Sequence, residues 1–195
     1  MALKSRRSFL LFAVGDAGFY GDPSRKTACK NEVKYPEQQQ RQLALLPASV
    51  ESRKAFLSKC VGCLKCLAAC PRKVLTVSGT DGHQLRPSMD FRYGWCYPEC
   101  SLCANSCPAG ALGGVLSKTE KLNKRAGVAQ LNRSICLRTD GVKCNACTRH
   151  CPVKALTFSK SGELLIDEVR CIGCGACEYH CPARPLTAIH VEGFK

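Results

Sequence analysis

Several features that mark common protein classes are missing or scarce in this chain of 195 residues. The longest apolar run, residues 9–14, is far shorter than the roughly 20 residues that a membrane-spanning helix needs. Gly113-Gly114 lacks the other glycines of a dinucleotide-binding loop, so no nicotinamide or flavin site is indicated. The 45% of hydrophobic residues includes every cysteine. The apolar core is therefore thin, and the chain needs another source of stability.

Cysteine is the residue in excess, with 17 copies. Disulfide scaffolds this rich in cysteine are usually secreted chains of under about 100 residues. Sixteen of the cysteines fall into four clumps, which argues against a mesh of disulfides. The clumping favours a metal or cluster scaffold instead. Cys29 stands apart from the clumps, and we interpret it as an unused thiol.

The first and last clumps share one spacing, C-x2-C-x2-C-x3-C-P. They comprise Cys60, Cys63, Cys66 and Cys70, and Cys171, Cys174, Cys177 and Cys181. Bacterial ferredoxins use this run to hold four-iron, four-sulfur clusters. Two-residue gaps bring three thiolates to three corners of one cubane. The fourth cysteine precedes a proline that cannot continue a helix, so it points away and binds the neighbouring cluster.

The two middle clumps keep the core C-x2-C-x3-C-P and move only the first cysteine outward. They comprise Cys96, Cys100, Cys103 and Cys107, and Cys136, Cys144, Cys147 and Cys151. An aliphatic stretch follows each clump, so one unit of ligand loop, Cys-Pro and short helix or strand recurs four times. Structural zinc uses separated C-x2-C pairs and fits poorly. Radical-SAM enzymes share the spacing of the second clump, but Cys107 supplies a ligand where those enzymes leave one iron open.

The intervals between clumps indicate which clumps exchange their fourth cysteines. They are 25, 28 and 19 residues long. The first is long enough for a hairpin through residues 79–82, and the last is close to the interval in small two-cluster ferredoxins. The middle interval contains a basic stretch, residues 118–125, which we interpret as an inter-domain connection. Tandem pairing follows, while a nested pairing of the first clump with the last stays open.

Tandem pairing predicts four ligand sets. Set one is Cys60, Cys63, Cys66 and Cys107, and set two is Cys96, Cys100, Cys103 and Cys70. Set three is Cys136, Cys144, Cys147 and Cys181, and set four is Cys171, Cys174, Cys177 and Cys151. The predicted fold is α+β, with two tandem bacterial two-cluster ferredoxin modules of short β-hairpins and short helices around two [4Fe-4S] clusters each. The expected domains are an N-terminal arm (1–51), module one (52–117), a basic connector (118–132) and module two (133–195).

Sixteen cysteines saturate four [4Fe-4S] clusters and leave no iron open for a substrate. We therefore expect an electron carrier and not an enzyme, with a donor and an acceptor supplied from outside. His150 and His180 each precede a fourth cysteine; we weigh hydrogen bonding near a cluster against a solvent-facing place in a turn, and prefer the latter. Sixteen thiolates and four cores of about +2 would lower the formal charge from +14 to about +6. The basic stretch lacks aromatic residues, so we interpret it as a solvated linker and expect no nucleic-acid partner.

The N-terminus contains S-R-R-S-F-L at residues 5–10, which resembles a twin-arginine export signal. The apolar stretch after it is short and is interrupted by Asp16, and no clear cleavage site follows. Export to the bacterial periplasm and a cytoplasmic location with a remnant signal both stay open.

Residues 52–195 resemble the four-cluster ferredoxin-type proteins of the NapF, NapG and MauM group. The resemblance rests on the four clumps, the seven-residue gap in the third, and the phrases CPAGAL, GVAQLNRSICL and CIGCGACEYHCPARP. These proteins accompany nitrate reductase and methylamine dehydrogenase systems. The resemblance implies electron transfer to or from a redox protein or a membrane-associated oxidoreductase complex. An accessory role in maturing such a partner is the alternative.

Overall fold

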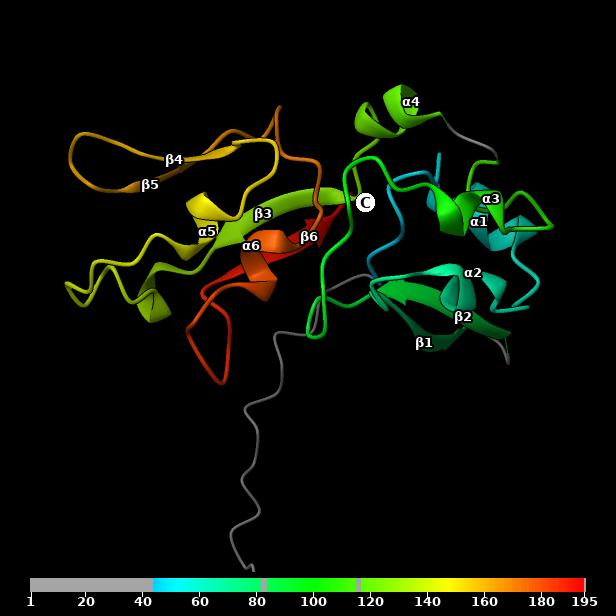
Figure 1. Ribbon diagram of the computed structural model, residues 1–195. Coiled ribbons are helices and arrows are strands. Elements are labelled where there is room, and N and C mark those ends of the chain that lie inside the picture. Colours follow the sequence, from blue (N-terminus) through cyan, green and yellow to red (C-terminus); the bar gives the residue numbers. More distant parts are fainter. Residues whose placement is uncertain (1–43, 82–83, 115–116, 195) are drawn as a thin grey trace, which may run out of the picture. The chain divides into compact units, whose positions relative to one another are not determined.

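Short helices alternate with two-stranded sheets along the chain (Figure 1). The computed structural model describes residues 44–81, 84–114 and 117–194, which all lie within one compact unit. We call residues 44–114 the first half and residues 126–194 the second half. None of the described helices is long and apolar enough to cross a membrane.

The first half contains three helices and one pair of strands. They are α1 (Arg53–Lys59), α2 (Lys65–Ala69), β1 (Leu75–Asp81), β2 (Gln84–Met89) and α3 (Leu102–Asn105). Helix α4 (Lys118–Leu122) then leads into the second half. The second half contains β3 (Gly127–Leu131), the 3-10 helix η1 (Arg133–Ile135), α5 (Ala146–Arg149), β4 (Leu156–Phe158), β5 (Leu164–Ile166), α6 (Ala176–Tyr179) and β6 (Ile189–Gly193).

All three sheets are antiparallel pairs: β1 with β2, β4 with β5, and β3 with β6. The first two are hairpins of consecutive strands. A hairpin is therefore present in the first half as expected, but residues 79–81, which were expected in its turn, belong to β1; residues 82–83 lie outside the described residues. Strands β3 and β6 come from opposite ends of the second half, so their pairing closes it. Because an isolated pair of strands is marginally stable, each sheet depends on what packs against it.

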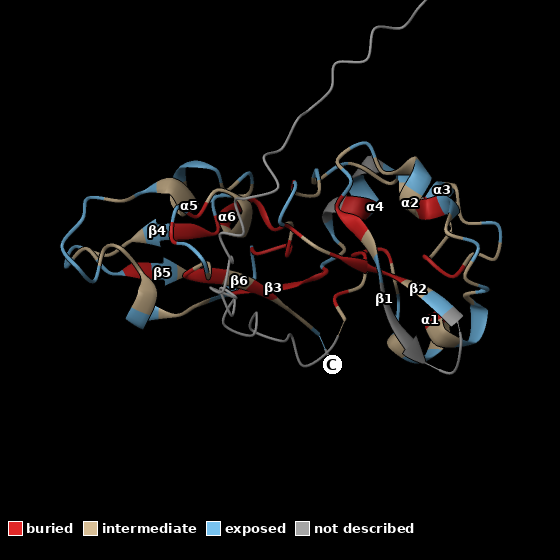
Figure 2. Cartoon of the chain, turned by 90° about the horizontal axis from the view of Figure 1, so that it is seen from below, coloured by how far each residue is buried: buried red, intermediate tan, exposed pale blue. Residues whose placement is uncertain are grey.

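Two groups of buried apolar residues form the core, and cysteines pack against both. The first group includes Phe56, Phe91 and Leu112, and the second includes Leu156 and Ile189. Figure 2 shows the buried residues running along β3 and β6. Val191 of β6 belongs to the first group, although its strand belongs to the second half. The two halves are therefore joined through a common core.

The folded part of the chain begins earlier than the arm boundary expected at residue 51. Leu45 is 1% exposed, and its carbonyl accepts a hydrogen bond of 2.7 Å from the Met89 N–H. The apolar residues of this segment thus cover the end of β2. Helix α1 leads into the first clump, and at its start the Ser52 side chain accepts from the Ala55 N–H at 3.2 Å.

The basic connector expected at 118–132 is not a solvated linker. Helix α4 occupies its first part, and β3, paired with β6, occupies its last part. Ser117 and Glu120 form a capping box at the start of α4, and Lys121 is only 5% exposed. The S-x-x-E pattern of a capping box was visible in the sequence. The number of charges in this stretch does not reveal that Lys121 is buried, because a lysine can bury its aliphatic stem even in a basic segment.

Gly175 is the residue at which the second half fits most closely against the first. Its φ is +77°, and a Cβ there would overlap the ring of Phe91, which is 1% exposed and has no room to move. Gly141 has a similar φ of +81°, but a Cβ there would meet nothing within 4 Å. Alanine substitutions at these two glycines therefore distinguish the cost of left-handed backbone strain from the cost of overpacking.

We predict that Gly175→Ala destabilises the protein much more than Gly141→Ala. The control carries only the left-handed strain of about 1–2 kcal/mol, whereas Gly175→Ala adds overpacking of about 1–3 kcal/mol. Thermal unfolding of the purified protein, with its metal retained, measures the difference. Equal losses in the two variants would show that the contact with Phe91 contributes nothing.

Candidate iron–sulfur sites

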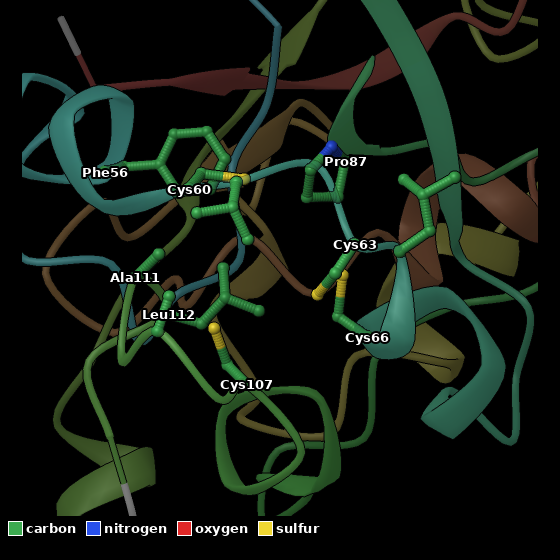
Figure 3. Close-up of a pocket in the computed structure, with 11 residues that line it drawn as sticks. Phe56, Cys60, Cys63, Cys66, Pro87, Cys107, Ala111 and Leu112 are labelled. Carbon is green, nitrogen blue, oxygen red and sulfur yellow. The ribbon is translucent and has the colours of Figure 1, made fainter. Parts of the chain in front are cut away.

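The cysteines of set one surround a single apolar cavity, drawn in Figure 3. The sulfurs of Cys60, Cys63, Cys66 and Cys107 face this space from the first ligand loop and from the turn after α3. The remaining wall is apolar and includes Phe56, Pro87, Ala111 and Leu112. Four thiols in an otherwise apolar wall are the donor set that a cubane needs.

Sets three and four each line a cavity of the same kind in the second half. The first cavity is lined by Cys136, Cys144, Cys147 and Cys181. The second is lined by Cys151, Cys171, Cys174 and Cys177. In both, a fourth cysteine from one clump lies with three cysteines from the other clump. The Cys151 sulfur also accepts a hydrogen bond of 3.2 Å from the Ala155 N–H.

Set two is brought together at the edge of α4. Its members Cys70, Cys96, Cys100 and Cys103 interact electrostatically with one another. Burial, and next the thiol of Cys96, raises the pKa of Cys103 to about 12. Lys121 acts in the opposite direction on Cys96 and Cys103, because its buried ammonium group favours the thiolates. Sequence reasoning missed Lys121, whose burial depends on α4.

Positive φ angles shape the ligand loops of the first and last clumps. Gly62 and Gly173 occupy the same position before the second cysteine, with φ of +69° and +67°. The residue after that cysteine is Leu64 in one loop and Gly175 in the other, with φ of +56° and +77°. The tight turns that two-residue gaps require are thus built from left-handed backbone.

The Cys-Pro turns repeat as well. The N–H of the third residue after the cysteine donates to the cysteine carbonyl at Lys73, Gly110 and Lys154, at 3.2 Å in each case. Those three residues have φ between +52° and +60°. In the fourth turn the side chain of Arg184 donates to the Cys181 carbonyl instead. The internal repeat inferred from the sequence therefore extends to backbone geometry.

One-turn helices link the sets in pairs. Helices α2 and α3 each separate a ligand of set one from a ligand of set two, and α5 and α6 do the same for sets three and four. Four residues of helix rise about 6 Å. Adjacent sets within one half are therefore close neighbours.

Burial raises the pKa of several thiols in all four sets. The pKa of Cys147 rises to about 11 and that of Cys174 to about 12, with burial as the main cause in both. The pKa of Cys177 is raised well above its ordinary value, and that of Cys66 is raised as well. Iron binds thiolates, so metal binding at these sites releases protons and weakens as the pH falls.

The arrangement of the four ligand sets suits a cubane and not a single metal ion. Within the described ranges, no three His, Cys, Asp or Glu side chains converge tightly enough to hold one ion. A cubane makes a different demand, since each thiolate binds a different iron around a common centre. All sixteen cysteines of the clumps are free thiols. The four sets therefore fit clusters in number and kind of donor.

The two histidines next to fourth cysteines stack on each other. The rings of His150 and His180 are 3.6 Å apart and nearly parallel, at 11°. Burial, His150 and Arg72 lower the pKa of His180, so this ring stays neutral at lower pH than usual. The Trp95 ring lies 4.8 Å from that of His180. His150 is exposed as preferred from the sequence, whereas His180 is half-buried in an aromatic contact.

One protein family and several known proteins are similar to parts of this chain. A family described as a 4Fe-4S dicluster domain matches residues 59–111 and 142–184. The ferredoxin-type protein NapG of Escherichia coli K12 is 33% identical over 114 residues, which are 55% of this chain and 48% of NapG. Over about half of its length, the chain is similar to ferredoxin-type proteins of the NapG and MauM kind.

Two further proteins are similar to a comparable share of the chain. The methylamine utilization ferredoxin-type protein MauM of Methylorubrum extorquens is 33% identical over 115 residues, 57% of this chain and 51% of that protein. NapG of Haemophilus influenzae is 31% identical over 120 residues, 57% of this chain and 42% of that protein. The chain thus spans about half the length of the curated relatives it matches. The matches support a ferredoxin-like α+β fold with [4Fe-4S] clusters.

Two features of the sequence are not part of this picture. The twin-arginine motif at residues 5–10 and Cys29 both lie outside the described residues.

The grouping of the sulfurs makes a prediction about iron content. Because Cys63 and Cys107 face one cavity, Cys63→Ala with Cys107→Ala should remove a single cluster and leave about 12 irons of about 16. Cys63→Ala with Cys70→Ala, which touches two sets, should leave about 8. Iron analysis of anaerobically purified variants measures both, with Cys63→Ala alone as the control at about 12. The reverse result would mean that each clump binds its own cluster.

Proposed function

We propose that the chain carries four [4Fe-4S] clusters, one in each ligand set, and passes single electrons between redox partners. The observation that supports this most is the gathering of sixteen cysteines into four groups of four, three of them around apolar cavities. The proposed arrangement is two tandem two-cluster modules, in the first and second halves, with the fourth cysteines exchanged within each half.

Electron transfer is the chemistry that such sites supply. In each proposed cluster, every one of the four irons has one position for a protein ligand, and a cysteine occupies it. No iron is therefore left to bind a substrate. Apolar walls limit the access of water and fix the cysteines, which favours a change of charge with little rearrangement. Cluster type, nearby charge, hydrogen bonds to sulfur and exposure set the potential. Lys121 beside set two and the N–H bond to Cys151 are two such influences. We therefore propose a carrier and not a catalyst.

The proposed partner is a redox protein within an oxidoreductase system. MauM is named for methylamine utilization, and NapG, like MauM, is named a ferredoxin-type protein. By analogy, we propose that this chain serves a larger oxidoreductase and takes its electrons from, or delivers them to, a neighbouring protein. A role in maturing that oxidoreductase is the competing function.

The two functions differ in whether the clusters change redox state during turnover. Reduced-minus-oxidised visible spectra should be recorded while the oxidoreductase that co-purifies with this chain turns over anaerobically. We expect the cluster absorbance to bleach and recover within each turnover. The variant Cys63→Ala with Cys107→Ala, which lacks one cluster, should slow turnover at least tenfold.

Clusters that keep one redox state throughout turnover would contradict electron transfer and favour maturation. In that case the partner, once assembled with wild-type protein, would turn over at its full rate after this chain had been removed. An electron carrier cannot be removed in this way.

A further inference from the structure

The two halves meet at a small number of backbone contacts that involve the ligand loops themselves. The Cys96 N–H donates a hydrogen bond of 2.9 Å to the Cys174 carbonyl. Cys96 belongs to set two in the first half, and Cys174 to set four in the second. Within the second half, the Ala126 N–H donates to the Ile172 carbonyl at 3.1 Å and ties the ligand loop of set four to the residue before β3. A cysteine of set two in the first half is thus joined by a backbone hydrogen bond to a cysteine of set four in the second half.

Two glycines allow close packing around this bond. Gly173 lies against the backbone of Gly127, where a Cβ would come within 2.5 Å of the Gly127 nitrogen. Gly175 lies against the buried ring of Phe91. Both glycines flank Cys174. Gly173 thus packs the ligand loop of set four against β3, and Gly175 packs it against Phe91 of the segment that leads to Cys96.

Aromatic side chains cover the same junction. The Trp95 ring lies 5.2 Å from that of Tyr179 and 4.8 Å from that of His180, measured between ring centroids. The Arg72 guanidinium lies 4.0 Å from the centroid of the Trp95 ring on the first-half side. Trp95 immediately precedes Cys96, so its ring fixes the position of that ligand relative to α6.

We infer that sets two and four are the inner pair of the four and that electrons cross between the halves at the Cys96–Cys174 junction. The inference rests on the proposed function. Within each half, a one-turn helix joins the inner set to an outer one, so the order along the protein is set one, set two, set four, set three. In the crossing, a cluster held by one inner set would lose one electron and a cluster held by the other inner set would gain it. Partners then exchange electrons with the outer sets.

The order can be tested by leaving only two clusters in place. The inner-pair variant, Cys63→Ala with Cys144→Ala, removes sets one and three. The outer-pair variant, Cys100→Ala with Cys171→Ala, removes sets two and four. Each is reduced with a europium(II) chelate, which reaches clusters across the range of roughly −700 to +450 mV, and is examined by low-temperature electron paramagnetic resonance.

We expect the inner-pair variant to give a spectrum split and broadened by interaction between two neighbouring spins. The outer-pair variant should give the sum of two isolated clusters. An uncoupled inner pair, or a coupled outer pair, would overturn the inference. Cys60→Ala with Cys136→Ala removes the same two sets as the inner-pair variant and replaces it if that protein does not fold.

Iron content separates failure of this inference from failure of the proposed function. Each two-cluster variant should retain about eight irons. A variant with about eight irons but the wrong coupling contradicts only the order of the sets. A variant with far fewer irons contradicts the ligand sets, and with them the proposed function.

Discussion

The exchange of fourth cysteines between neighbouring ligand loops is the constraint on which the rest of this structure depends. Cys107 lies with the first loop and Cys151 with the last, in each case across a one-turn helix from its own clump. The Cys-Pro turn after each helix then redirects the chain. With few large apolar side chains available, the small sheets gain their support from packing around these loops. Folding and metal binding are therefore expected to be coupled.

The same constraint accounts for the electrostatics of the sites. Burial raises the pKa of thiols such as Cys103 and Cys174, so the metal-free sites favour neutral sulfur. Thiolates in these positions need compensating positive charge, which iron would supply at each proposed set and Lys121 supplies in addition at set two. Much of the basic excess in the sequence is thus expected to offset the clusters.

The spacing of the cysteines predicted the local features of the structure. The short gaps within a clump determine which three sulfurs meet, and the interval after Cys70 predicted the hairpin of β1 and β2. The structure places Cys107 beside the first loop, where the tandem interpretation put it. Long-range packing was not readable in this way. Leu45 covers β2 from a segment assigned to the arm, and Lys121 is buried within a stretch interpreted as solvated. Nothing in the intervals between clumps indicates that the Cys96 N–H donates a hydrogen bond to the Cys174 carbonyl.

The central claim is that one chain holds four cubanes, and native mass spectrometry of the anaerobically purified protein tests it most directly. The account predicts one dominant species, heavier than the chain alone by four Fe4S4 units, which loses whole units as the collision energy rises. A dominant species with two units, with zinc, or with no metal would contradict it.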